Sequence, residues 1–123
     1  KIEGEYKKWY RNGLLWEHAM FKNDKKNGKY KHWLSTGQLS EQCHFVDGKL
    51  DGECIAWHEN GQMRKKSYFV NGKQEGEMKC WNYDGRLKFQ CNYVDNKREG
   101  ESKRWHDDGR LVEKSKSTSC TIS

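Results

Sequence analysis

The sequence contains no proline, and it has no apolar run of about 18 residues, the length that a membrane-spanning helix requires. Because proline is the residue that cannot donate to a β-ladder, its absence leaves every position open to strand pairing. Hydrophobic residues are scarce as well, at 33% of the chain against 34% charged residues. Aromatic residues nevertheless reach 13%, with six Trp, which is far more than a disordered chain carries. The composition therefore predicts a thin fold with one buried stripe and a large solvated surface.

The residues that are present recur with a period of 24 positions. FVDGKLDGE at 45–53 returns as FVNGKQEGE at 69–77, and weaker versions occupy 21–29 and 93–101. A fixed period of this kind indicates a repeat array, in which no single copy can bury its own hydrophobic face. Five copies are predicted at about 4–27, 28–51, 52–75, 76–99 and 100–114, followed by a C-terminal tail or cap at 115–123.

Large hydrophobic residues occupy three columns of this repeat, one position per copy in each column. We expect all three columns to form one buried spine, because Leu39, Cys43 and Phe45 share one parity along a strand. A ladder of Trp rings that binds a ligand is the alternative interpretation of the Trp column. The predicted spine consists of Trp9, Trp33, Trp57, Trp81, Trp105, Leu15, Leu39, Met63, Leu87, Leu111, Phe21, Phe45, Phe69 and Tyr93.

Turn dipeptides predict that each copy is one β-hairpin. Asn-Gly and Asp-Gly favour a two-residue type I′ turn, since both central residues need a positive φ. Thr36 departs from this pattern and predicts a strained or different turn in the second copy, and a second turn is expected at Asp47-Gly48 and its equivalents. The expected turn residues are Asn12, Gly13, Gly37, Asn60, Gly61, Asp84, Gly85, Asp108 and Gly109.

These observations predict the fold class. It is all-β: an elongated, single-layer antiparallel repeat array of about five 24-residue β-hairpins. Ten strands at about 4.8 Å each would make an array roughly 48 Å long. Helices are not expected, because the 12 glycines interrupt the chain too often.

The five cysteines are odd in number, and no secretory signal is visible, so free thiols that pack as small hydrophobic side chains are expected. A bridge from Cys43 to Cys91 is excluded, because four strand spacings separate them by about 19 Å. A cross-strand bridge between Cys43 and Cys54, or between Cys80 and Cys91, is the open alternative.

No residue pattern predicts catalysis or a metal, cofactor or small-molecule site. Cys43 and His44 point to opposite faces of a strand, and Cys54 lies about 13 Å from His58 along a strand, too far to share a zinc ion. The glycines mark turns and form no phosphate-binding loop. The net charge of +6 is spread among both signs, so nucleic acid is not an expected partner.

Two segments, GEYKKWYRNGLL at 4–15 and GECIAWHENGQM at 52–63, resemble MORN repeats. The match is strongest to the variant with Asn-Gly hairpins, which is similar to repeats of bacterial antitoxin-like proteins and of large DNA viruses. The resemblance implies a twisted single layer of hairpins that acts as a protein–protein scaffold, sometimes attached to membranes, without catalysis of its own. Cys54, Met78 and Ser102 depart from the pattern, since they replace the aromatic seen at Tyr6 and Tyr30.

Two surfaces are candidates for partner binding. Tyr10, Trp16 and Met20 could form an exposed apolar patch near the N-terminal end of the array, and simple packing among neighbouring residues is the alternative. Lys25, Lys49, Lys73 and Lys97 form a column that should line one edge at intervals of about 10 Å. This edge could meet anionic lipid or an acidic partner, although acidic residues in the same turns favour a merely solvated edge.

The leading functional prediction is a non-enzymatic scaffold for protein–protein interaction or structural assembly, in a virion-associated setting or elsewhere. Self-association through the open array ends is part of that prediction. The alternatives are a peripheral module that binds anionic membranes and an antitoxin-like inhibitor of a toxin partner. The expected location is intracellular (cytoplasmic) or virion-associated, neither secreted nor transmembrane.

Overall fold

The computed structural model describes residues 3–117, and in this part of the chain every regular element is a β-strand. No helix in that range is long and apolar enough to cross a membrane. The ten longer strands are β1 (Gly4–Trp9), β2 (Leu15–Lys22), β4 (Gly28–Trp33), β5 (Leu39–Val46), β7 (Gly52–Trp57), β8 (Met63–Val70), β10 (Gly76–Trp81), β11 (Leu87–Val94), β13 (Gly100–Trp105) and β14 (Leu111–Ser117). Four two-residue strands, β3 (Lys25–Lys26), β6 (Lys49–Leu50), β9 (Lys73–Gln74) and β12 (Lys97–Arg98), follow the second strand of the first four hairpins.

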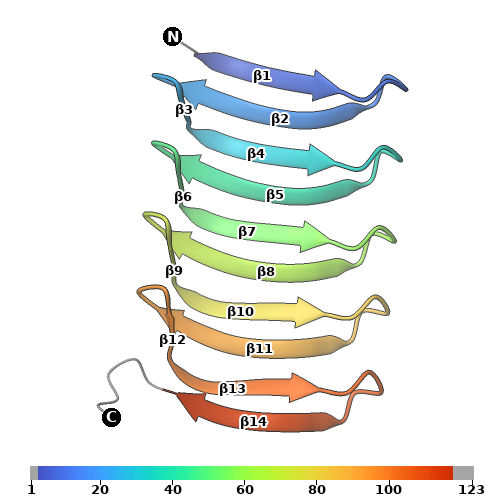
Figure 1. Ribbon diagram of the computed structural model, residues 1–123, viewed down its shortest axis with the longest axis vertical. Helices are drawn as coiled ribbons and strands as arrows, with labels where there is room; N and C mark the ends of the chain where they lie inside the picture. The colour runs from blue at the N-terminus through green and yellow to red at the C-terminus, as the bar shows by residue number, and fades with distance from the viewer. Residues whose placement is uncertain (1–2, 118–123) are drawn as a thin grey trace.

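The strands form one open antiparallel sheet in which five hairpins are stacked in chain order (Figure 1). The hairpins are β1–β2, β4–β5, β7–β8, β10–β11 and β13–β14, called the first to fifth hairpins below. The predicted all-β, single-layer repeat array is therefore confirmed. Strand β14 continues to Ser117, beyond the array end expected at 114. The remainder of the expected tail, 118–123, lies outside the described residues.

At one end of the strands, the hairpins close with three-residue loops that contain the predicted turn residues. In the first hairpin the Gly13 amide donates to the Tyr10 carbonyl (3.0 Å) and the Tyr10 amide donates to the Leu14 carbonyl (2.8 Å). Gly13 has a φ of 90°, while Asn12 is not among the residues with positive φ. This is a type I turn followed by a left-handed glycine, so the predicted type I′ geometry is wrong here, because three residues form the loop.

Thr36 illustrates the consequence of that loop geometry. It occupies the position equivalent to Asn12, where φ is negative, and the Gly37 amide donates to the Leu34 carbonyl (2.9 Å) as in the other copies. The expectation of a strained or different turn in the second copy is therefore wrong. A β-branched residue fits this position because a positive φ is not required.

At the opposite end of the strands the chain makes two-residue turns, and the type I′ geometry occurs there. Asp47 and Gly48 have φ values of 50° and 83°, and Val46 pairs with Lys49 across the turn. The equivalent turns are Asn23–Asp24, Asn71–Gly72 and Asp95–Asn96. After each turn the chain reaches a glycine such as Gly28, where φ is 116° and an added Cβ would lie 3.2 Å from Met20 Cβ. This glycine is required both for its backbone conformation and for the close approach.

A β-bulge in each hairpin decides which side chains share a face. Lys8 pairs with Glu17, but its neighbour Trp9 pairs with Leu15, so Trp16 is the extra residue. The same shift recurs in the other four hairpins. Because one extra residue inverts the alternation of the strand, the Trp and Leu columns lie on one face and the Phe column on the other. The single spine predicted from the sequence is therefore wrong, and its columns are divided between a Trp face and a Phe face.

The buried side chains lie on the Phe face. They are small or flexible: Ala19, Cys43, Ala56, Ser67, Met78 and Cys91, with Ala19 and Cys91 each only 1% exposed. Rings on neighbouring strands cover this line of small residues, as where Tyr6 meets Phe21 edge to face at 5.8 Å. The Trp column is not the buried core: Trp9 is 58% exposed and the other four are partly buried. A single layer has no second sheet to cover the large indole rings.

Candidate interaction surfaces

The Trp face is crossed by polar pairs that link the two strands of a hairpin. Glu5 accepts from His18 Nε2 at 2.8 Å, and Glu77 accepts from Gln90 Nε2 at 2.6 Å. Lys66 lies 3.3 Å from Glu53 and Lys114 lies 2.9 Å from Glu101 at the equivalent positions. The hydrogen bond from His18 lowers the pKa of Glu5, and the hydrogen bond from Lys114 lowers the pKa of Glu101. Four of the five hairpins thus carry a charged or polar cross-strand pair on this face, and each such pair is called a rung below.

Beside these rungs the Trp face is apolar and indented. A hollow of about 270 Å³ lies between the third and fourth hairpins, lined by Met63, Lys66, Tyr68, Glu77, Lys79 and Trp81. Val70 continues the same face and is 57% exposed, and Tyr68 is 38% exposed. An aromatic floor with lysine and glutamate at its sides has the composition of a protein-binding surface.

The Phe face holds a cluster of rings and charges in the second hairpin. The Tyr30 hydroxyl donates to Glu17 Oε2 at 2.7 Å, and the Lys26 ammonium lies 4.4 Å above the Tyr30 ring. Burial of the Tyr30 hydroxyl, followed by its hydrogen bond to Glu17, raises the pKa of Tyr30. The Tyr30 ring meets Phe45 edge to face at 5.9 Å. The cluster therefore holds rings and charges together at partly buried positions.

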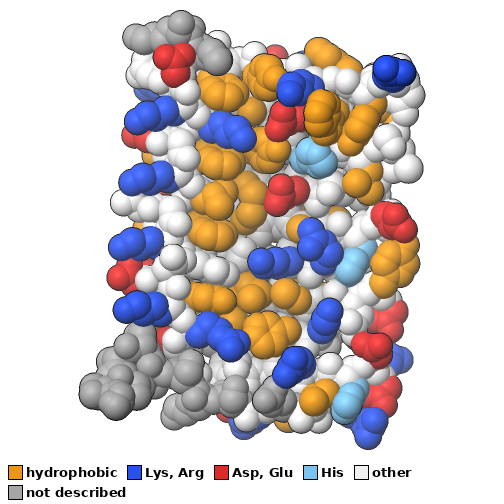
Figure 2. Space-filling view, in the orientation of Figure 1, with side chains coloured by type: hydrophobic (Ala, Val, Ile, Leu, Met, Phe, Trp, Pro, Cys, Tyr) orange, Lys and Arg blue, Asp and Glu red, His pale blue; other side chains and the backbone are white. Residues whose placement is uncertain are grey.

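Charge is divided unevenly along the Phe face, as Figure 2 shows. One column of this face holds two carboxylates, Glu17 and Glu41, which belong to the first and second hairpins. The equivalent position holds Lys65 in the third hairpin and Phe89 in the fourth, and the bulge positions beside them hold Arg64 and Lys88; the three cations are exposed. The sequence analysis missed this change from acidic to basic. Comparison of positions 17, 41 and 65 across the repeats would have revealed it.

The predicted N-terminal patch is only partly assembled. The rings of Tyr10 and Trp16 lie 5.7 Å apart, and Trp16 Nε1 donates to His32 Nε2 at 3.0 Å. The Tyr10 hydroxyl donates to the Trp33 carbonyl (2.7 Å), which fixes the ring against the second hairpin. Met20 does not join them, because the bulge at Trp16 places Met20 on the Trp face, against Gly28. The patch as predicted is therefore wrong for Met20.

The predicted lysine column, Lys25, Lys49, Lys73 and Lys97, is exposed along the edge of two-residue turns, where Figure 2 shows a file of basic side chains. Acidic groups lie beside it: Lys73 is 3.1 Å from Asp95. Other carboxylates hold the turns themselves, since Asp51 Oδ2 accepts from the Asn71 amide at 3.0 Å. The positive charge of this edge is thus partly compensated.

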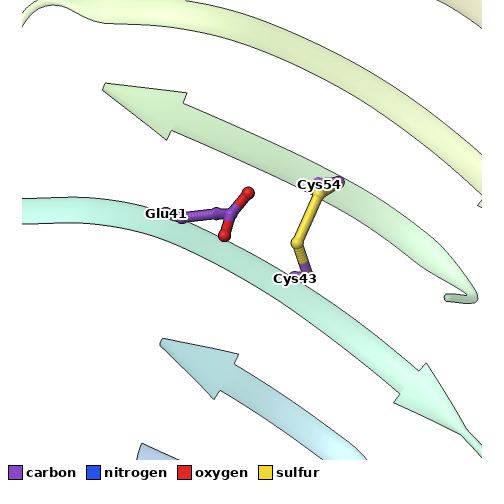
Figure 3. Close-up of side chains that lie close together, drawn as sticks. All are labelled: Glu41, Cys43 and Cys54. Carbon is purple, nitrogen blue, oxygen red and sulfur yellow. A yellow bond between two sulfur atoms is a disulfide. The ribbon is translucent and has the colours of Figure 1, made fainter. Parts of the chain in front are cut away.

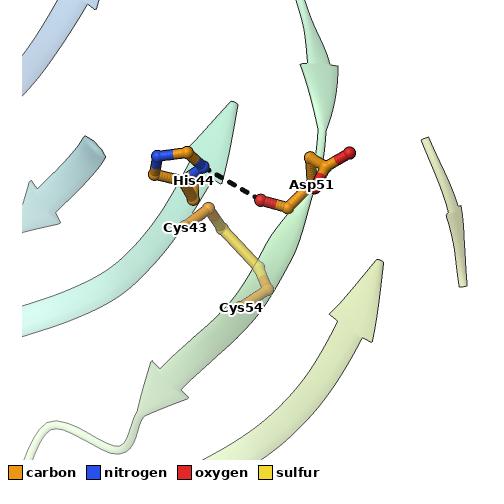
Figure 4. The surroundings of a disulfide bond; sticks show 4 residues. All are labelled: Cys43, His44, Asp51 and Cys54. Atoms are coloured by element: carbon orange, nitrogen blue, oxygen red, sulfur yellow. Dashed lines mark hydrogen bonds between the residues drawn. A yellow bond between two sulfur atoms is a disulfide. The ribbon is translucent and has the colours of Figure 1, made fainter. Parts of the chain in front are cut away.

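The cysteines differ from the expectation of free thiols. Cys43 and Cys54 form a disulfide between β5 and β7 (Figure 4). The register places them directly opposite each other, with their Cα atoms 4.3 Å apart, so no backbone movement is needed. Next to the bridge, His44 Nδ1 donates to the Asp51 carbonyl at 3.0 Å. Cys80 and Cys91 are free, and burial raises the pKa of both thiols.

The Glu41 carboxylate lies beside this disulfide, and its ligand atom and the two sulfurs are within 4.8 Å of one another (Figure 3). Thiolate is the form of cysteine that binds metals, and the disulfide leaves neither sulfur in that form. Within the described residues this is the one group of at least three such side chains close enough to share an ion. It therefore offers a single carboxylate in the structure.

The family assignment follows from four tandem matches to a model described as the MORN repeat variant, at residues 2–23, 26–47, 50–71 and 74–95. The chain belongs to this family. The fifth hairpin lies beyond the last matched segment. Repeats of this family generally serve as scaffolds for protein or membrane interaction.

Comparison with curated proteins finds no significant match. Two solved structures match this chain in part: a Staphylococcus aureus TarM mutant in complex with fondaparinux, α-GlcNAc-glycerol and UDP, and TarM itself. Both are 11% identical, with TM-scores of 0.47 and 0.45 and coverage of 78% and 80% of this chain. The chain matches only 19% of the length of either protein, and likeness at this level carries no functional argument.

Proposed function

We propose that this chain is a non-enzymatic scaffold that binds a protein partner along its Trp face. The observation that carries the proposal is the distribution of exposed apolar side chains. Of the ten exposed large hydrophobic residues in the described part of the chain, six lie on the Trp face: Trp9, Val46, Tyr68, Val70, Val94 and Leu111. Exposed apolar side chains gathered on one face, with charged pairs between them, favour a protein-binding surface.

The geometry of the face suggests how a partner would be bound. Comparable groups return in most hairpins, so an extended partner would meet similar contacts at intervals of about 10 Å. Indole and phenol rings supply large contact area at low cost in side-chain entropy, and the carboxylate rungs orient polar groups of the partner. No catalytic, cofactor or metal site is part of this proposal.

The test is capture of binding proteins from the native source with matched variants. The double variant Val70→Lys and Val94→Lys changes two exposed Trp-face positions, at 57% and 48% exposure. Val112→Lys, at 44% exposure on the Phe face, is the control. We expect a protein that survives a high-salt wash on wild type and control but is lost on the double variant. Equal retention by all three proteins would contradict the proposal.

Binding to anionic membranes is the second candidate, and the exposed lysine edge favours it. Co-sedimentation with vesicles containing phosphatidylserine tests it. Binding that falls with added salt, and that is abolished when Lys25, Lys49, Lys73 and Lys97 are all changed to Glu, would establish this function. An inhibitor of a toxin and a virion component are particular cases of the protein scaffold, and the identity of the captured partner distinguishes them.

A further inference from the structure

Glu41, Cys43 and Cys54 bring one carboxylate and two sulfurs together on the Phe face (Figure 3). The ligand atom of Glu41 and the two sulfurs all lie within 4.8 Å of one another. Two thiolates that share a tetrahedral zinc ion, each about 2.3 Å from it, lie about 3.8 Å apart. The three atoms are therefore already near the separations that the ligands of one zinc ion need.

Strand pairing holds this arrangement, so it does not depend on the disulfide. Glu41 pairs with Ala56 between β5 and β7, and the same register sets Cys43 opposite Cys54, with their Cα atoms 4.3 Å apart. Glu41 and Cys43 are two residues apart on β5, so they point to the same face. Reduction of the bridge breaks one covalent bond and leaves the backbone hydrogen bonds of both strands in place. Rotation of the side chains alone then brings the two sulfurs to a common ion.

The surroundings of the group suit a bound cation. A hollow of about 270 Å³ opens beside it, and its lining includes Glu41, Cys54 and Ala56. One water molecule takes about 30 Å³ in the liquid, so the hollow has room for an ion and a water ligand. Arg64 and Lys65 line the same hollow. A zinc ion with two thiolates and one carboxylate has one net negative charge, which these two cations would compensate.

His32 lies opposite Glu41 on β4, but its ring nitrogens are not placed to act as ligands. Its Nε2 accepts a hydrogen bond from Trp16 Nε1 at 3.0 Å, so the proton of the neutral imidazole is on Nδ1. Neither ring nitrogen then offers a lone pair to a metal. The group therefore supplies three protein ligands and leaves the fourth position to water, as in zinc sites with an open coordination position.

We propose that the reduced chain binds one Zn²⁺ ion through the sulfurs of Cys43 and Cys54 and a carboxylate oxygen of Glu41. Two molecules of a thiol reduce the bridge: each protein sulfur gains one electron and one proton, and the two reductant molecules leave as their own disulfide. Zn²⁺ then displaces the two thiol protons, because thiolate is the form of cysteine that binds metals.

The ion would cross-link the same strands as the disulfide does. In the oxidised chain the bridge joins β5 of the second hairpin to β7 of the third (Figure 4), and in the reduced chain the ion joins them. Oxidation by a disulfide of the same class takes two electrons from the thiolates, re-forms the bridge and releases Zn²⁺. The site lies on the Phe face, so its success or failure is independent of the proposed partner surface on the Trp face.

The experiment is metal binding by the whole chain after reduction with a water-soluble phosphine. Co²⁺ should give the near-ultraviolet thiolate charge-transfer absorption and the intense visible bands of a tetrahedral site, and added Zn²⁺ should abolish both. After gel filtration, reduced wild type should retain one more Zn²⁺ per chain than Cys54→Ser does. Unreduced wild type should retain no more than that variant.

Matched variants separate this site from the other thiols. Cys54 and Cys80 are both partly buried on the Phe face, so Cys80→Ser is the control and should keep the cobalt bands. Glu41→Gln should weaken Zn²⁺ binding at least about tenfold, since even the loss of an outer-shell contact costs about 10–100-fold. In urea, reduced wild type should have a higher midpoint with Zn²⁺ than with a chelator, and Cys54→Ser should show no such difference. Circular dichroism establishes that each variant is folded.

Four results would overturn the inference. The first is a cobalt spectrum of reduced wild type without thiolate bands. The second is equal retention of Zn²⁺ by reduced and unreduced wild type. The third is an equal loss of binding in Cys80→Ser and Cys54→Ser, which would place the ion at the free thiols. The fourth is a folded Glu41→Gln variant that binds Zn²⁺ as tightly as wild type.

Discussion

The Phe face and the Trp face carry equally regular columns, yet the buried residues of the described chain all lie on the Phe face. Its central column consists of Ala19, Cys43, Ser67 and Cys91, and all four are buried. The Trp face has the larger rings, but Trp9 is 58% exposed. The difference shows that, in a single-layer sheet, the positions that become buried are those with small side chains. Flanking rings can cover a small side chain completely, whereas the column indoles stay at least partly exposed.

The electrostatics of the two faces differ for the same reason. Carboxylates on the Trp face stand in water and keep lowered pKa values through their hydrogen bonds, as at Glu5 and Glu101. On the Phe face burial dominates, and it raises the pKa of Tyr30, Cys80 and Cys91. The two faces are therefore expected to respond differently to truncation, reduction and pH.

Side-chain truncation should show the largest difference. Met78 is 7% exposed on the Phe face, and Met78→Ala should lower the free energy of unfolding by about 2–5 kcal/mol, because it opens a cavity. Val70→Ala, at a 57% exposed position of the Trp face, should change it by less than about 0.5 kcal/mol. Urea denaturation measures both. Equal losses would break the comparison, since they would mean that the Trp face is buried as well.

Removal of the disulfide should have the second-largest effect on the free energy of unfolding. The Cys43–Cys54 bridge closes a short loop, with a sequence separation of 11, so Cys43→Ala with Cys54→Ala should cost about 2–3 kcal/mol. Dithiothreitol should destabilise wild type by a similar amount and leave the double variant unchanged. A thiol titration of the denatured protein should find two more thiols after reduction than before. An unchanged thiol count would show that the bridge is absent.

Alkaline pH should act on the Phe face. Because burial raises the pKa of Tyr30 above its ordinary value, the folded state holds the phenolic proton more tightly than the unfolded state. The contribution of Tyr30 is thus complete below the ordinary tyrosine pKa and is lost as pH rises towards the folded value. Denaturation midpoints measured between neutral pH and about pH 11 should fall in wild type and fall less in Tyr30→Phe. Identical profiles would contradict this role.

Acidic pH should have the smallest effect, on the Trp face. The pKa values of Glu5 and Glu101 are lowered by hydrogen bonds from His18 and Lys114, so their contributions are complete above the ordinary glutamate pKa. They are lost as pH falls through the lowered folded values. Both carboxylates are exposed, so the change in denaturation midpoint should be slight and should shrink in high salt. A Glu101→Gln variant that loses stability on acidification as steeply as wild type would argue against the rung.

Particular residues show how far the sequence could be interpreted. The period of Gly4, Gly28 and Gly52 suffices to predict hairpins, their number and their order, because each copy must stack on the next. The turns at Asn12-Gly13 and Asp47-Gly48 share nearly the same dipeptide, yet they differ in geometry. The number of residues between the paired strands decides that geometry, and the dipeptide alone does not reveal it.

The candidate surfaces were harder to predict from the sequence than the fold was. Lys25 and its equivalents were predicted correctly at an edge, because they adjoin a turn. Met20 and Trp16 have the same parity along the sequence, so a strictly alternating strand would place them on one face. The bulge at Trp16 breaks that alternation, and with it the predicted Trp spine.

By itself, the sequence determined the repeat, the all-β class and the family, since these depend on spacing along the chain. Only the tertiary structure decided which columns share a face, which cysteines meet and where the charges gather. A one-residue bulge inverts every side chain that follows it, and Cys43 meets Cys54 only through the register of two hairpins. Both are properties of strand pairing, which composition and period do not specify.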